Sequence, residues 1–225
     1  MTPLFLAALL WVGVHVGIAG TRVRAALAGR LGEAGFRGAY SLVSVGAITA
    51  LVFAWRNAMD AGASPPLWSA PAWLGWALAA LMLPAFVLFA GSVLAPNPTA
   101  AGGERALAAR VEPRGVMRIT RHPMLWSFAI WSAVHVAGNG DGASALFFGA
   151  FGLTALLGMP SIDAKLAARD PAGWAALAER TTLFPSLSRV RWRELLLPGA
   201  VGLAAWAGLL HAHPWLFGVS PVPGW

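Results

Sequence analysis

The sequence has no cysteine, one tyrosine and few charged residues. Without cysteine, the chain forms no disulfide and offers neither a thiolate metal ligand nor a thiol nucleophile. Charged residues make up 11% of the chain, whereas soluble domains average about 25%. The carboxylates all lie outside the apolar segments, which argues against a proton pump or a cation transporter. Because the glycine-rich phosphate loop, HExxH and Gly-x-Ser-x-Gly are also missing, the sequence gives no support to an NTPase, a zinc protease or a serine hydrolase.

Apolar residues are what the sequence has in excess. They make up 58% of the chain, twelve tryptophans among them, and the mean hydropathy is +0.66. These values are typical of an integral membrane protein. The first apolar stretch, from Leu4, has no basic residue before it, Arg22 and Arg24 follow it, and no Ala-x-Ala cleavage site precedes a mature soluble domain. We therefore expect a permanent span there, not a signal peptide.

Six apolar segments are predicted to cross the membrane as helices. They are Leu4–Ala19, Ala39–Trp55, Ala72–Leu94, Pro123–Ala137, Ser144–Met159 and Leu195–Leu210. The fourth and fifth are shorter than the roughly 20 residues that a perpendicular crossing needs. The predicted fold is all-α, a polytopic membrane helix bundle that forms one domain over residues 1–225.

The positions of the basic residues predict the orientation of this bundle. Every lysine and arginine except Arg56 lies between the first and second, the third and fourth, or the fifth and sixth spans. By the positive-inside rule these segments are cytoplasmic and both termini are outside. The same rule explains the net charge of +7, so we expect the lipid bilayer and not nucleic acid as the partner. The segment Ser161–Asp170 is predicted to be a cytosolic amphipathic helix with Asp163 and Lys165 on a solvated face, and Gly173–Arg180 continues the pattern.

Two histidines, His15 and His135, lie within predicted spans. An ionisable residue at such a place is a functional candidate, because its burial in hydrocarbon is costly. The structural alternatives are a neutral imidazole bonded across a helix interface for His15 and an interfacial position for His135. His122, between Arg121 and Pro123, is predicted to lie at the cytosolic edge of its span, near the propionates of a bound haem or near a substrate.

A haem would suit the surroundings of His15. Arg22 is seven residues later, on the same helical face and about 10 Å along the axis. This spacing would place an imidazole ligand for the iron in the apolar zone and a guanidinium for the haem propionates nearer the water. Trp11 would supply an apolar wall. We expect His15 and His135 to be the iron ligands of a haem. The residues expected around the haem are Arg22, Arg118, Arg121, His122, Trp11, Phe128 and Trp131. His135 is preferred to His122 as the second ligand because Phe128 and Trp131 share its face and make it drier.

Four blocks of the sequence resemble the NnrU family of bacterial inner-membrane proteins and, through it, 15-cis-zeta-carotene isomerase. The blocks are His15–Arg22, Gly32–Arg37, Met117–Pro123 with Trp131 and His135 after it, and Asp163-x-Lys165 followed by Glu179–Pro185. The resemblance implies a multi-pass protein of the inner membrane and a link to the expression of nitrite and nitric oxide reductases. It also implies haem b held by the histidines at positions 15 and 135.

Three functions follow as hypotheses from the sequence. The first is a haem b membrane protein with a redox, nitric-oxide-linked or sensing role, which includes isomerase-like chemistry on a hydrophobic small molecule. The second is a membrane methyltransferase that uses S-adenosylmethionine, because Arg121-His122-Pro123 also occurs in isoprenylcysteine carboxyl methyltransferases. The third is a non-enzymatic assembly factor.

Overall fold

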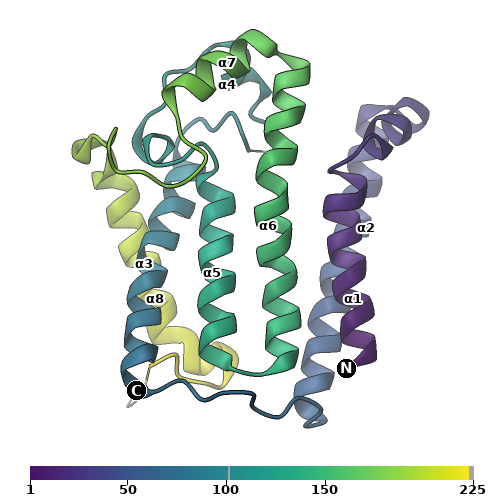
Figure 1. Ribbon diagram of the computed structural model, residues 1–225, viewed down its shortest axis with the longest axis vertical. Coiled ribbons are helices and arrows are strands. Elements are labelled where there is room, and N and C mark those ends of the chain that lie inside the picture. Colours follow the sequence, from purple (N-terminus) through teal and green to yellow (C-terminus); the bar gives the residue numbers. More distant parts are fainter. Residues whose placement is uncertain (101, 223–225) are drawn as a thin grey trace.

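The computed structural model describes residues 1–100 and 102–222, and within them the regular structure is helical (Figure 1). The α-helices are α1 Thr2–Val12, α2 Val23–Asp60, α3 Ala72–Leu94, α4 Glu104–Ala108, α5 Pro123–Asn139, α6 Gly142–Arg169, α7 Pro171–Arg180 and α8 Leu196–Phe217. A π-helical turn, Gly13–Ile18, continues α1, and 3₁₀ turns cover Gly115–Arg118 and Trp192–Leu195. One isolated bridge joins Pro66 to Asp141. The prediction of an all-α fold is confirmed.

Four helical segments are long and apolar enough to cross a membrane. They are Val23–Asp60, Ala72–Leu94, Gly142–Arg169 and Trp192–Phe217. Thr2–Ile18 is a shorter apolar helix, and α5 has 17 residues. The chain is therefore a membrane protein, and four of the six predicted spans lie in helices of sufficient length.

The helices stand side by side in the order α8, α3, α5, α6 and then the pair α1 and α2 (Figure 1). The start of α1 and the C-terminal end of α8 lie at one end of the bundle, which we call the terminal end, and α4 and α7 cover the other, which we call the capped end. Helix α6 packs against α5 on one side and against α1 and α2 on the other. It is the element to which both halves of the bundle attach.

Small residues allow neighbouring helices to approach closely. A Cβ atom at Gly152 of α6 would lie 2.4 Å from Ser132 Oγ of α5, and one at Gly202 of α8 would lie 2.8 Å from the backbone of Val87 of α3. Ser132 Oγ donates to the Phe148 carbonyl at 2.6 Å, across the same α5–α6 contact. Small residues and a shared hydroxyl at helix contacts are typical of packing in membranes, where lipid removes most of the hydrophobic drive for association.

Two sequence predictions about element boundaries are wrong. The segment from Gly20 to Gly38 is not a loop, because α2 begins at Val23 and is interrupted only at Gly32, where φ is +70°. Residues 23–31 are mostly Ala, Leu and Arg, which are strong helix formers. The fifth span is not short either, since α6 continues through Pro160 to Arg169. The predicted separate amphipathic helix at Ser161–Asp170 is the far end of α6, whereas α7 confirms the helix predicted after it.

Candidate functional site

His15 lies in the π-helical turn at the end of α1. Its Nδ1 is 2.8 Å from the Trp11 carbonyl oxygen, and its ring centroid is 3.9 Å from that of Trp11 and 5.9 Å from that of Tyr40. A carbonyl only accepts, so Nδ1 carries the proton and Nε2 has the lone pair. Nε2 has no hydrogen-bond partner within the described part of the chain. Single π turns are frequent at functional sites.

His135 of α5 repeats this arrangement. Its Nδ1 is 2.8 Å from the Trp131 carbonyl oxygen, and its ring stacks on Phe148 of α6 with the centroids 4.6 Å apart. Nε2 again has no partner among the residues that the structure describes. Histidines that bind metals usually donate the other ring N–H to a carbonyl or carboxylate, which fixes the tautomer. Both imidazoles are thus held in the protonation state that an iron ligand needs.

A continuous chain of aromatic rings lies between the two histidines. Ring centroids are 3.9 Å apart for His15 and Trp11, 4.7 Å for Trp11 and Phe151, 5.4 Å for Phe151 and Trp131 and 5.0 Å for Trp131 and His135. His15 is about 20 Å along the helix from Thr2, while His135 is only about 6 Å from the terminal-end residue Asn139. An iron bound to both imidazoles would lie between them, where these three rings lie in this structure.

The two aromatic residues predicted beside His135, Phe128 and Trp131, pack against different helices. Trp131 contacts Phe148 and Phe151 of α6, whereas Phe128 contacts Phe89 of α3 with centroids 6.0 Å apart. Phe128 is also 38% exposed on the lipid-facing surface of the bundle. The structure therefore brings Trp11 and Trp131, but not Phe128, to the two histidines.

The predicted arginines occupy three different environments. Arg22 is exposed at the N-terminus of α2. Arg118 pairs with Glu194 at 3.1 Å and with Glu112 at 3.6 Å, and Arg121 pairs with Asp163. Arg118 and Arg121 thus hold parts of the capped end together, and only Arg22 belongs to the segment that follows His15.

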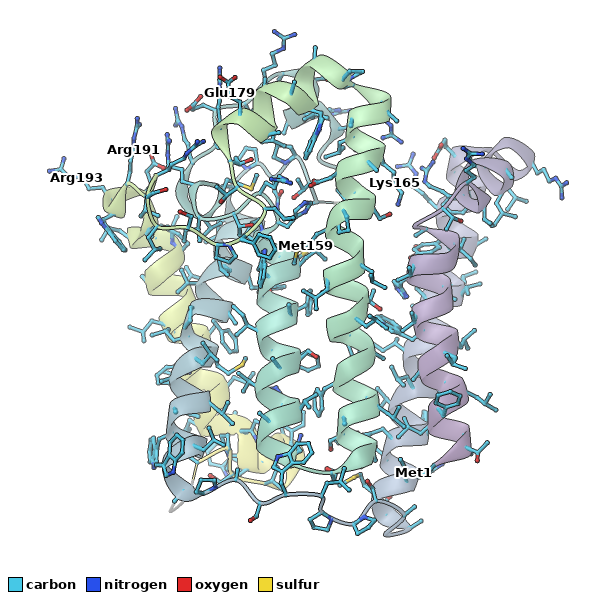
Figure 2. The ribbon with its side chains drawn as sticks, viewed as in Figure 1. Met1, Met159, Lys165, Glu179, Arg191 and Arg193 are labelled. Atoms are coloured by element: carbon cyan, nitrogen blue, oxygen red, sulfur yellow. The ribbon has the colours of Figure 1, made fainter. Side chains whose placement is uncertain are left out.

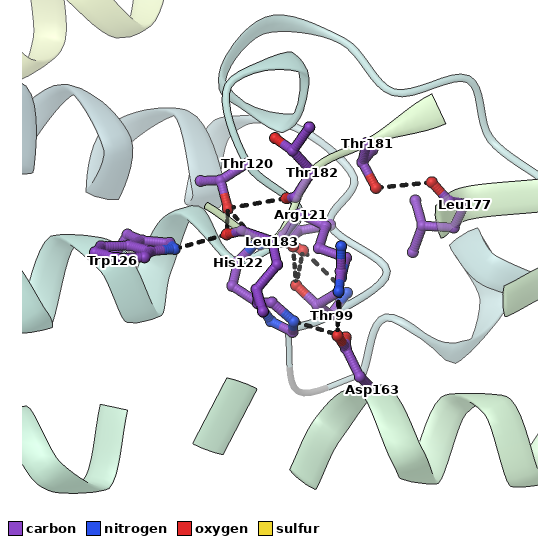
Figure 3. Close-up of polar contacts among 11 residues, drawn as sticks. Thr99, Thr120, Arg121, His122, Trp126, Asp163, Leu177, Thr181, Thr182 and Leu183 are labelled. Carbon is purple, nitrogen blue, oxygen red and sulfur yellow. Dashed lines mark hydrogen bonds and ion pairs between the residues drawn. The ribbon is translucent and has the colours of Figure 1, made fainter. Parts of the chain in front are cut away.

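Arg121, His122 and Asp163 form a buried cluster at the capped end (Figure 3). Arg121 donates from Nε and Nη2 to Asp163 Oδ2 at 2.9 and 2.5 Å, and its guanidinium carbon is 5.1 Å from the ring centroid of Trp174. His122 Nε2 donates to Asp163 Oδ1 at 2.7 Å. The His122 side chain is 0% exposed and that of Asp163 13%. The prediction of a solvated face for Asp163 is wrong, because its carboxylate accepts hydrogen bonds from both side chains inside the cap, whereas His122 lies at the N-terminus of α5 and its predicted position at the cytosolic edge stays a prediction.

Backbone carbonyls of the segment after α7 complete the cluster (Figure 3). Arg121 N donates to the Thr182 carbonyl at 2.9 Å. Thr120 Oγ1 and Trp126 Nε1 both donate to the Leu183 carbonyl at 2.8 Å. His122 Nδ1 is buried, and no hydrogen-bond partner for it occurs in residues 1–100 or 102–222. The start of α5 is therefore bound to the segment after α7 inside the cap.

Comparison with known proteins gives a family for the chain. The family described as NnrU protein matches residues 3–221. The chain belongs to the NnrU family. No curated protein and no solved structure matches it.

In this NnrU protein, two of the sequence blocks that carried the resemblance meet. The end of the third block and the start of the fourth form the Arg121–His122–Asp163 cluster, whereas the block that begins with His15 starts in the π turn. Among the described residues, no group of three or more His, Asp or Glu side chains is arranged to hold a metal ion.

Lys165 is a residue of the NnrU protein that sequence reasoning missed near His15. Its Nζ donates to the Ala19 carbonyl, and Ser161 Oγ donates to the Gly20 carbonyl at 3.2 Å. Figure 2 shows Lys165 directed from α6 toward α1 and α2. Ala19 is four residues, or about one turn, beyond His15. An ammonium group therefore lies near the capped-end side of His15, and only its separation of 150 residues in sequence concealed it.

Proposed function

We propose that this NnrU protein is a multi-pass protein of the bacterial inner membrane that binds haem b. His15 and His135 would be its two iron ligands. The observation that carries the proposal is that the two imidazoles make the same hydrogen bond. In each, Nδ1 donates to the backbone carbonyl four residues earlier, and Nε2 has no hydrogen-bond partner within the described chain. Its role is redox or nitric-oxide-linked, as the family resemblance implies.

The residues fit this cofactor in their chemistry but not in their present positions. Imidazoles beside indole and phenyl rings form an apolar ligand set, which suits the apolar body of a haem. Lys165 and Arg22 offer positive charge to propionates on the capped-end side of His15. The rings of Trp11, Phe151 and Trp131 must move before one iron can contact both histidines.

The protein's own contribution is to hold the ligands and exclude water. The Trp11 and Trp131 carbonyls keep the proton on Nδ1 of each histidine, so that Nε2 is available without a proton transfer. A haem b held by both histidines would supply one-electron transfer, and displacement of one histidine would be needed before a diatomic gas such as nitric oxide could bind. A hydrophobic small molecule could reach such a centre from the bilayer, which leaves isomerase-like chemistry as part of the proposal.

Absorption spectra of three single variants test the assignment. We expect the purified protein to give a haem b pyridine haemochrome and a six-coordinate low-spin ferrous spectrum. His15→Ala should lose most of the haem, His135→Ala should retain it in a high-spin form, and His122→Ala should keep the wild-type spectrum in the folded fraction. Loss of the low-spin signal in His122→Ala but not in His135→Ala would mean that the second ligand is wrong.

The same preparation separates this proposal from the two other hypotheses. A protein without a Soret band that is stabilised against heat by S-adenosylhomocysteine would support the methyltransferase. The closed packing of Arg121 and His122 around Asp163 gives that reading no open adenosyl pocket at the Arg-His-Pro motif. A protein without a cofactor that is extracted with a stable partner would support the assembly factor.

A further inference from the structure

A groove of about 510 Å³ opens at the capped end of the bundle. It runs from Ser92 and Ala95, at the end of α3, across the connecting loop to Arg105 and Ala106 of α4. Because α3 is one of the membrane-crossing candidates, the groove begins where an apolar span ends and polar residues start. Phospholipid headgroups occupy this depth of a bilayer.

Asn97 gives the groove a polar side chain of fixed orientation. The backbone N–H of Thr99 donates to Asn97 Oδ1 at 3.0 Å, so the amide oxygen must face Thr99 and the amide nitrogen must face away. Asn97 is 7% exposed, and its Nδ2 is buried without a partner among the described residues. A buried amide that lacks an acceptor is costly. It indicates that an acceptor belongs beside Asn97.

The charge of the groove is positive. Arg105 lines it and is exposed, and it makes no ion pair with any residue that the structure describes. The neighbouring carboxylate, Glu104, points elsewhere and pairs with Arg169 at 3.1 Å. No described residue of the lining carries a carboxylate. The groove therefore offers two kinds of donor, an amide and a guanidinium, to an anionic acceptor.

Asn97 and Thr99 make close contacts at two places. Gly103 lies so close to Asn97 that a Cβ atom there would be 2.2 Å from the Asn97 carbonyl oxygen. Thr99 Oγ1 donates to the Arg121 carbonyl at 2.6 Å, which ties the loop to the Arg121–His122–Asp163 cluster. A loop held at both places keeps the amide in position before a ligand binds, which lowers the entropy cost of binding.

We propose that this groove binds the phosphate of an anionic phospholipid, with Asn97 Nδ2 and Arg105 as its donors. The acceptor chemistry is that of a phosphate oxygen, and the position at the end of α3 selects a lipid headgroup over a free phosphate. Apolar lining residues such as Pro96 and Val111 suit the glycerol part of such a lipid. The site is independent of the haem proposed above.

Native mass spectrometry of the purified full-length protein tests this site. The probes are dioleoylphosphatidylglycerol, dioleoylphosphatidylcholine and inorganic phosphate. Asn97→Asp keeps the oxygen that faces Thr99 but removes the amide donors, and Arg105→Gln removes the charge of an exposed residue. Each should weaken phosphatidylglycerol binding about tenfold or more, as expected for a charge-assisted hydrogen bond. Arg110→Gln, which changes an exposed arginine nearby that does not line the groove, should change binding less than about twofold.

Three results would overturn the proposal. Equal losses in Arg105→Gln and Arg110→Gln would mean a diffuse surface attraction. Equal affinity for phosphatidylcholine would mean that the negative charge is not recognised. Displacement of the lipid by millimolar inorganic phosphate would assign the groove to a soluble ligand. Arg105→Gln decides the question even if Asn97→Asp does not fold, because Arg105 is exposed and unpaired among the described residues.

Discussion

Asp163 connects three elements through one carboxylate. It lies in α6, and its two oxygens bind Arg121 and His122 at the start of α5, beside Trp174 of α7. Its side chain and that of Arg121 are each 13% exposed. Removing one partner of a buried ion pair leaves the other charge uncompensated.

We therefore predict that Asp163→Asn lowers the free energy of unfolding by about 3–5 kcal/mol. The measurement is denaturant or thermal unfolding in detergent, followed by circular dichroism. Glu104→Gln is the matched control, because it removes a carboxylate from the exposed Arg169–Glu104 pair, where the side chains are 51% and 56% exposed. That change should cost less than about 1 kcal/mol. Similar losses in the two variants would show that the Asp163 pairs do not stabilise the cap.

The histidines show how far single residues can be read from sequence. His15 and His135 were selected because ionisable residues in apolar runs are rare, and the structure gives both a defined tautomer. The partner of His122 could not be read in the same way. Asp163 is 41 residues further along the chain, in a stretch whose composition favours a solvated helix face. A turn of about 100° per residue relates neighbours on one helix but says nothing of contacts between helices.

The α3–α8 contact depends on one glycine. A Cβ atom on Gly202 would be 2.8 Å from the backbone of Val87, and backbone atoms cannot give way as a flexible side chain can. Gly199 lies three residues earlier on the same helix and has nothing within 4 Å of its Cβ position. The two glycines differ mainly in this contact.

Gly202→Ala should therefore destabilise the protein by about 1–3 kcal/mol through overpacking. Gly199→Ala should be neutral or stabilising by up to about 1 kcal/mol, because alanine is the better helix former. Thermal unfolding in one detergent would compare the two. If both variants melt together, α8 does not pack against α3 as closely as the structure indicates.

The sequence predicts some elements far better than others. The third span, Ala72–Leu94, has the same bounds in the structure, since polar or turn-forming residues limit its apolar run at both ends. The start of α2 at Val23 was missed because arginines among apolar residues suggested a loop. Pro160 suggested an end to the fifth span, but a proline removes only one backbone donor and the following Ala, Leu and Lys residues continue α6. The π turn at Gly13–Ile18 has no distinctive composition.

The arrangement of the whole chain bears on its orientation in the membrane. The start of α1 and the C-terminal end of α8 lie at the terminal end of the bundle, and the loop before α5 and α7, which carry basic residues, lie at the other (Figure 1). Under the positive-inside rule, we predict that the end with the basic segments faces the cytoplasm and the terminal end faces outside.

Fusions with alkaline phosphatase test the orientation, since the enzyme folds only outside the cytoplasm. We expect a fusion at the C-terminus to be active and one after Gly103 to be inactive, with a difference of about tenfold or more. The expectation follows from the energy of placing Arg105, Arg110 and Arg114 on the outer side. An inactive C-terminal fusion together with an active one after Gly103 would invert the bundle.

Helix α6 carries an aromatic ring and an ion-paired carboxylate at different depths. Phe151 lies between Trp11 and Trp131, and Asp163 is twelve residues, or about 18 Å, further along the same helix. A tilt or rotation of α6 as a rigid body would move both residues together. A ligand that displaced the helix at Phe151 would therefore also strain the ion pair with which Asp163 holds the cap.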